Sequence, residues 1–222
     1  QVVVFCGDPR ALSSGTLGPR VGDIAATAQR AARSLSARVW SFAATVTQDP
    51  GLAHHNVFFG QTPQSEFDAL RAGRMPHDPT LYICAEDRGS DAAAPDGPER
   101  FEIILNAAPL TIAEPQDNEV DTCHQLTFQT LDRFGLRFDT APDRGALTTP
   151  AMFDRMFPAS AGSLYGQSPH GMTAALKRPR ARTKIRGLYL AGGGTHPGAG
   201  VPMAALSGRF AAEAIATDLV ST

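Results

Sequence analysis

Residues 187–215 read GLYLAGGGTHPGAGVPMAALSGRFAAEAI, and this stretch predicts a strand, a glycine-rich turn and a helix in direct succession. The apolar run 188–191 has the length and content of a buried strand. Five glycines within residues 192–200 then allow the backbone to come close to a ligand. Pro202 suits the first turn of a helix, and the sequence is helical in pattern from Met203 onward. The apolar face of this helix carries Leu206, Phe210, Ala214 and Ile215.

A strand, a glycine-rich turn and a helix start together favour binding of an anion or a polarised carbonyl. Free backbone N–H groups point out of the helix start, and the helix dipole adds roughly half a positive charge there. A plain strand-to-helix turn, in which glycine only permits tight packing, explains the same pattern equally well. These residues alone leave both interpretations open.

The sequence of residues 192–202, GGGTHPGAGVP, resembles the C-terminal flavin-contacting signature of the bacterial carotenoid (phytoene) desaturase family. Members of this family are FAD enzymes with the fold of the amine oxidase superfamily. The resemblance implies that the helix start faces the pyrimidine side of the isoalloxazine ring and stabilises the negative charge that develops there on reduction. It assigns FAD contacts to Gly192, Gly193, Gly194, Thr195, His196, Gly198, Gly200, Val201, Pro202 and Met203.

The first residues, QVVVFCGDP, also read as a buried strand followed by a turn. The family has an Asn-Ala-Asp-like turn after a similar strand, whereas Cys6-Gly7-Asp8 stands here. Asp8 is a further candidate for cofactor binding, because ligands gather at strand C-termini; a turn-forming role before Pro9 is the alternative. The GxGxxG dinucleotide fingerprint is not found in these residues. We therefore expect a C-terminal portion of a desaturase that lacks the N-terminal half of the FAD domain and binds FAD weakly or not at all on its own.

The middle of the chain predicts an α/β (α+β) fold with an antiparallel or mixed sheet and helices on one side. The apolar face of that sheet is either a wall for a long hydrocarbon ligand or a surface packed on helices. The expected strands are 39–46, 54–59, 81–85 and 101–106, and the expected helices are 11–38, 65–72, 120–134 and 148–157, with an exposed, mobile loop at 87–98. The expected domains are the end of an FAD-domain segment at 1–12, a substrate-binding domain at 13–180, and a return to the Rossmann-like FAD domain at 181–222.

The resemblance extends over most of the chain and is densest from residue 148 to residue 215. The segments 78–85, 94–97 and 103–109 are closer to the 1-hydroxycarotenoid 3,4-desaturases (methoxyneurosporene dehydrogenases) than to the phytoene desaturases. The implied activity is dehydrogenation of C–C single bonds in an acyclic carotenoid such as a hydroxy- or methoxyneurosporene. Hydride would pass to FAD and electrons onward to a quinone or oxygen. A phytoene desaturase, a carotene isomerase and a non-catalytic carotenoid- or lipid-binding module remain alternatives.

Composition restricts the partners and the compartment. The 222 residues carry a net charge of −2, which argues against nucleic acid as the principal partner. The three cysteines have no metal-ligand spacing and suggest a reducing cytoplasm, and no apolar run is long enough to span a membrane. The basic cluster at 177–186 is either solvated surface or a contact for anionic lipid, which would make the protein peripherally membrane-associated.

Histidines are the remaining candidates for chemistry. His196 could act as an acid or base near the flavin, but a role in positioning the turn is favoured, so the catalytic residues are not identified. His54 and His55 are adjacent, and in a strand they would face opposite ways, so no metal site is expected. His170 is expected to be a loop residue.

Overall fold

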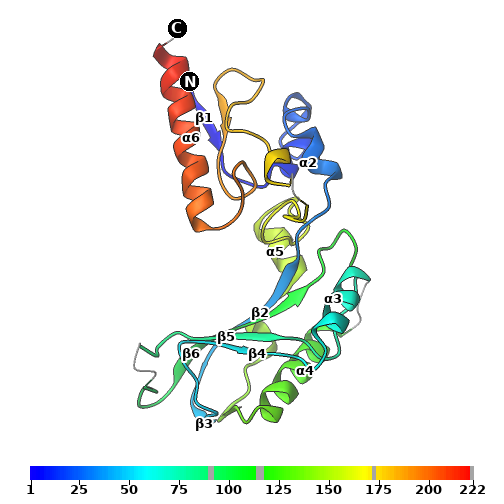
Figure 1. Ribbon diagram of the computed structural model, residues 1–222, viewed down its shortest axis with the longest axis vertical. Helices are drawn as coiled ribbons and strands as arrows, with labels where there is room; N and C mark the ends of the chain where they lie inside the picture. Colours follow the sequence, from blue (N-terminus) through cyan, green and yellow to red (C-terminus); the bar gives the residue numbers. More distant parts are fainter. Residues whose placement is uncertain (90–92, 114–117, 172–173, 221–222) are drawn as a thin grey trace. The chain divides into compact units, whose positions relative to one another are not determined.

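The structure is a computed structural model that describes residues 1–89, 93–113, 118–171 and 174–220. The chain forms two compact units (Figure 1). Residues 36–150 form one, here called the central unit, and residues 1–35 with 151–222 form the other, the terminal unit. Residues 13–35 and 151–180, which the sequence analysis assigned to the substrate-binding domain, therefore pack in the same compact unit as the C-terminal strand and helix.

An antiparallel five-stranded sheet is the main element of the central unit. In spatial order its strands are β4 (His55–Phe58), β5 (Leu81–Ala85), β6 (Glu99–Ala107), β2 (Ser36–Ala44) and β8 (Leu147–Thr148). Every second residue of β5 and β6 is buried, which is the period of two expected for a strand with one face on a core. The four strands predicted in this region are thus confirmed to within a few residues.

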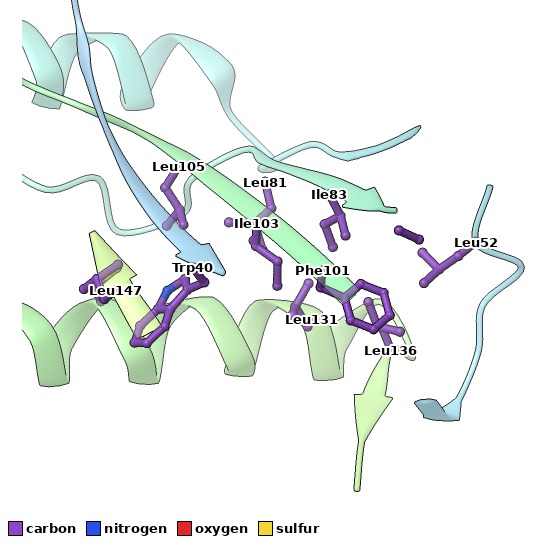
Figure 2. Close-up of a cluster of buried hydrophobic side chains, with 12 residues drawn as sticks. Trp40, Leu52, Leu81, Ile83, Phe101, Ile103, Leu105, Leu131, Leu136 and Leu147 are labelled. Atoms are coloured by element: carbon purple, nitrogen blue, oxygen red, sulfur yellow. The ribbon is translucent and has the colours of Figure 1, made fainter. Parts of the chain in front are cut away.

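The core of the central unit lies between one face of this sheet and helix α4 (Glu119–Arg133) (Figure 2). Ile83 and Ile103 are paired across β5 and β6, and Trp40 is paired with Ile103 across β2 and β6. From α4, Leu131 is completely buried against them. Full burial of one such aliphatic side chain stabilises the fold by about 1.5–3 kcal/mol. The apolar face of the sheet is therefore packed on a helix, which is the second of the two interpretations left open by the sequence.

The remaining elements of the central unit lie around this core. They are α3 (Pro63–Arg71), the short helix η2 (Arg144–Ala146) and a two-stranded sheet of β3 (Val46–Gln48) and β7 (Arg137–Phe138). Trp40 also makes a polar contact inside the core, since its Nε1 donates to Thr127 Oγ1 of α4 at 3.2 Å. This hydrogen bond satisfies the indole N–H that burial removes from water.

Two parallel strands and a long helix organise the terminal unit. Strand β1 (Val3–Phe5) pairs in parallel with β9 (Leu188–Leu190), and α6 (Val201–Val220) packs on β9. Phe210, Ala214 and Ile215 of α6 lie against buried Tyr189 and Ala191, as the apolar face predicted. Shorter helices complete the unit: α1 (Arg10–Ser13), η1 (Pro19–Val21), α2 (Ala26–Arg30), α5 (Pro150–Met156) and η3 (Ala175–Lys177).

The single helix predicted over 11–38 is wrong. The chain instead makes α1, η1 and α2 and then enters β2 at Ser36. Gly18 has φ +93°, a conformation outside the right-handed helix, and Pro19 follows it. The apolar spacing that suggested one helix therefore belongs to separate short turns.

The helices can be compared with the length and hydropathy that a membrane-spanning helix needs. Within the described residues, no helix combines the length and the apolar content that a membrane span requires.

Candidate functional site

The turn between β9 and α6 is fastened at its base by a buried serine. Ser207, in the second turn of α6, is fully buried. Its Oγ accepts a hydrogen bond from the Gly192 N–H at 2.7 Å and lies 2.7 Å from the Ala204 carbonyl, to which it donates. Sequence analysis did not single out Ser207, because a serine within a helix normally reads as a surface residue.

The glycines of the turn have different roles. A Cβ on Gly194 would lie 2.4 Å from Pro9 Cδ, and one on Gly192 would lie 3.1 Å from the Cys6 carbonyl oxygen. These two glycines therefore permit close packing of the turn on the segment after β1. A Cβ on Gly200, by contrast, would have no atom within 4 Å. Gly200 is required by its backbone conformation, because its φ of +99° is one that residues with a Cβ rarely adopt.

The start of α6 is open on the side beyond Gly200. Val201 is 85% exposed and Met203 41% exposed. In the first turn of a helix the N–H groups have no intrahelical acceptor, so they can serve a ligand there. The sequence-predicted residues Gly200, Val201, Pro202 and Met203 therefore form an accessible helix start.

Arg178 holds the turn from the other side. Its guanidinium donates to the carbonyls of Gly193 at 2.7 Å, Gln167 at 2.8 Å and Tyr165 at 3.1 Å. The residue is buried, and this burial lowers the pKa of Arg178, although the nearby carboxylate of Asp8 opposes the effect. The interpretation of Arg178 as part of an exposed basic cluster is wrong, because its charge is used to bind three backbone carbonyls.

Asp8 lies beside the turn, but other groups already use its carboxylate. Oδ1 accepts from the Arg10 N–H at 2.9 Å, and Oδ2 forms an ion pair with the buried guanidinium of Arg33. Arg33 in turn donates to the Ser160 carbonyl at 2.9 Å. The turn-forming role, which the sequence left as an alternative, is therefore present.

A cavity of 220 Å³ lies next to this network. It is small compared with the 300–1,000 Å³ of sites for drug-sized ligands, so it could take only one end of a dinucleotide. Its lining includes the aromatic residues Phe153, Phe157 and Tyr165, together with Asp8, Gly193 and Gly194.

Thr195 and His196 lie in the middle of the turn. Thr195 is 1% exposed, and its Oγ1 is a buried hydroxyl without a hydrogen-bond partner in the described structure. The His196 ring stacks on Phe210 of α6, with centroids 6.3 Å apart and planes at 12°. The backbone N–H of His196 donates to the Pro179 carbonyl at 2.8 Å. These contacts favour a positioning role for His196. Gly198 is buried next to the Arg178 side chain.

His54 and His55 do not face opposite ways. Their ring centroids are 4.2 Å apart, because His54 lies before β4 and only His55 belongs to the strand. The argument from strand alternation is therefore wrong for this pair. His170 is exposed in an irregular segment, as predicted.

Comparison with known proteins shows which proteins the chain is similar to. Residues 154–216, which include the turn and most of α6, match the family described as flavin containing amine oxidoreductase. The chain is 57% identical over 219 residues to the hydroxyneurosporene desaturase of Cereibacter sphaeroides. This alignment covers 99% of this chain and 43% of that protein. Identity is 50% over 218 residues to the enzyme of the same name from Rhodobacter capsulatus, covering 98% of this chain and 43% of that protein.

The Rubrivivax gelatinosus hydroxyneurosporene desaturase is 43% identical over 222 residues, covering 99% of this chain and 42% of that protein. The chain thus spans less than half the length of these curated relatives. The match over residues 154–216 places that part of the chain in the class of flavin-containing amine oxidoreductases. Within that class, the chain belongs to the carotenoid desaturase family.

Proposed function

We propose that this chain supplies part of an FAD-dependent carotenoid desaturase that acts on an acyclic hydroxy- or methoxyneurosporene. The observation that carries the proposal is the open helix start that follows the glycine-rich turn, at Gly200 to Met203. The names of the relatives support the substrate class.

The residues of the turn fit a flavin. A helix start attracts negative charge, and Gly200 leaves it unobstructed. The unpartnered hydroxyl of Thr195 is a second polar group available to a ligand. The parallel pair β1 and β9, with Val3 53% exposed on β1, is consistent with two strands of a larger Rossmann-like sheet.

The chain's own residues would bind and orient the cofactor and would not carry out the redox chemistry. When bound, FAD would supply the hydride acceptor, while the substrate loses a hydride and a proton from neighbouring carbons and the electrons pass on to a quinone or oxygen. The N–H groups at the start of α6 would stabilise negative charge on the pyrimidine edge of the ring. Arg178 and Ser207 hold the turn in place, and the stacked His196 positions it against α6.

The proposed activity is tested with the full-length protein, FAD and liposomes containing either 1-hydroxyneurosporene or phytoene. We expect the absorption of 1-hydroxyneurosporene to move to longer wavelength, with loss of two hydrogens by mass spectrometry for each new double bond. Desaturation of phytoene alone would favour a phytoene desaturase. A spectral change without loss of hydrogen would indicate an isomerase, and binding without any conversion would indicate a carotenoid-binding module.

Substitution of Val201 tests the role of the helix start. Val201→Asp should stabilise α6 by about 0.3–1 kcal/mol, because a carboxylate suits a helix N-terminus. The same charge should repel negative charge on the flavin and slow its reduction about tenfold, which corresponds to about 1.4 kcal/mol. Flavin reduction is followed by its absorbance, together with the reduction potential. Val201→Asn is the matched control, and equal effects of the two variants would contradict the proposed contact.

We also propose that the basic segment contacts an anionic membrane surface. Lys177, Arg180, Lys184 and Arg186 are exposed, and Leu176, next to them in sequence, is 75% exposed. Each such charge near an anionic surface contributes about 1 kcal/mol, so Lys184→Glu with Arg186→Glu should weaken sedimentation with acidic liposomes at least about tenfold at low salt. Arg71→Glu, on an exposed helix of the central unit, should have little effect. Unchanged sedimentation of the double variant would argue against membrane contact through this segment.

A further inference from the structure

Three potential metal ligands meet on the central unit, whereas the glycine-rich turn belongs to the terminal unit. His55 on the edge strand β4 is paired directly with Cys84 on β5, so their side chains share one face of the sheet. His54 is held beside them, because its carbonyl accepts the Ala85 N–H at 2.9 Å. One ligand atom from each of the three residues lies within 4.8 Å of the other two.

The distances are close to those of a tetrahedral zinc site. Zn–S bonds of about 2.3 Å and Zn–N bonds of about 2.0–2.1 Å place the sulfur and nitrogen atoms about 3.5 Å apart. Cys84 Sγ and His54 Nε2 are 3.7 Å apart. The third donor, a ring nitrogen of His55, lies within 4.8 Å of both of these atoms.

The rings are oriented by further hydrogen bonds, as in metal sites where an outer partner fixes each histidine. His54 Nδ1 lies 2.9 Å from the Arg88 carbonyl oxygen, which can only accept a hydrogen bond. His54 is therefore protonated at Nδ1, and in this tautomer the lone pair of Nε2 can bind a metal. Arg88 is itself fixed, because its guanidinium is buried and paired with Glu99. His55 Nδ1 contacts the Tyr82 hydroxyl at 2.7 Å, which holds this ring next to that of His54.

The local charge also favours a cation. Glu102 on β6 is the register partner of Cys84, so the two side chains lie on the same face. Glu86 follows β5 directly, two residues after Cys84. Two imidazoles and a thiolate form a donor set suited to zinc or copper, with a carboxylate or water as fourth ligand.

We propose that His54, His55 and Cys84 bind a divalent transition metal, with Zn²⁺ as the natural candidate. The metal would join the segment before β4 to β5 and so secure the exposed edge of the sheet. The site is independent of the proposed flavin chemistry, because all of its residues belong to the central unit.

The experiment measures binding of Zn²⁺ and Co²⁺ to the metal-free purified protein. We expect one equivalent of Zn²⁺ to bind and to raise the melting temperature, and Co²⁺ to give a thiolate charge-transfer band. Loss of an outer-shell partner weakens metal binding by up to about 100-fold, and loss of a ligand should have at least that effect. Cys84→Ser and His55→Gln each remove one ligand, so each should weaken Zn²⁺ binding at least about 100-fold. Cys6→Ser and His77→Gln, at exposed positions elsewhere, should bind like the wild type.

Either of two results would overturn the proposal: a cobalt complex without the thiolate band, or equal Zn²⁺ affinity in wild type and Cys84→Ser. Circular dichroism checks that each variant is folded. Because His55 is exposed, His55→Gln keeps the test decisive even if Cys84→Ser proves unstable.

Discussion

Arg88→Met should lower the free energy of unfolding of the central unit by about 3–5 kcal/mol, because it leaves a buried carboxylate without its cation. The Arg88 and Glu99 side chains are each 2% exposed and are joined by hydrogen bonds of 2.8 and 2.7 Å. Arg88 also donates to Asp49 Oδ2 at 2.7 Å and to the Leu52 carbonyl at 3.0 Å. These contacts fix the loop after β5 and the segment before β4 at the same point.

Fluorescence of Trp40 during urea unfolding measures this effect selectively. Trp40 is the only tryptophan in the sequence, and it is buried in the core of the central unit. Arg100→Met is the matched control, since its ion pair with Asp87 is exposed to solvent and should contribute little to stability. Arg88→Met combined with Glu99→Leu should recover much of the lost stability, because no buried charge remains. A loss no larger than that of Arg100→Met would show that the buried pair is not important for stability.

The two strongest periodic patterns in the sequence predicted their elements well. Leu81–Ala85 is β5 with the predicted bounds, and α4 spans Glu119–Arg133 where 120–134 was predicted. Both elements bury a single face, so their pattern records the packing directly. The helix start after the glycine-rich turn was also predictable, because Gly200 and Pro202 mark it locally.

Buried charges could not be predicted in the same way. Arg88 lies in a stretch of turn-forming residues, and Arg178 lies in a run of basic residues, so each one resembles solvated surface. The burial of each arginine depends on a partner elsewhere in the chain. Arg88 pairs with Glu99 and Asp49, and Arg178 donates to the Gly193 carbonyl. The proximity of His54 and His55 was missed because β4 begins between them.

Gly194→Ala tests whether that glycine is needed for packing. The new Cβ would lie 2.4 Å from Pro9 Cδ, so we expect a loss of about 1–3 kcal/mol in the terminal unit. Gly208→Ala, in the middle of α6, would meet no atom within 4 Å and should stabilise the helix by up to about 1 kcal/mol. Hydrogen exchange of peptides from α6 measures both effects. Equal protection in the two variants would contradict the packing role of Gly194.

Arg178→Met should destabilise the terminal unit by at least about 4 kcal/mol and loosen the glycine-rich turn. Hydrogen bonds from a charged donor contribute about 1.5–3 kcal/mol each, and this change removes three of them while leaving their carbonyls without the donor. The methionine fills much of the same space, so the loss reports the hydrogen bonds more than the packing. Because the Gly193 carbonyl is one acceptor, the turn before α6 should gain mobility even where the unit remains folded.

Hydrogen exchange of residues 188–204 and binding of FAD by the full-length protein measure the two consequences. Arg178→Lys should recover only part of the stability, because an ammonium group cannot reach three carbonyls in the planar geometry of a guanidinium. The exposed neighbour Arg180, changed to Met, should leave both measurements at the wild-type level. If Arg178→Met matched Arg180→Met, the shape of the turn would not depend on Arg178. If it loosened the turn but left FAD affinity unchanged, the turn would not be the flavin contact, and the proposed cofactor site would have to be abandoned.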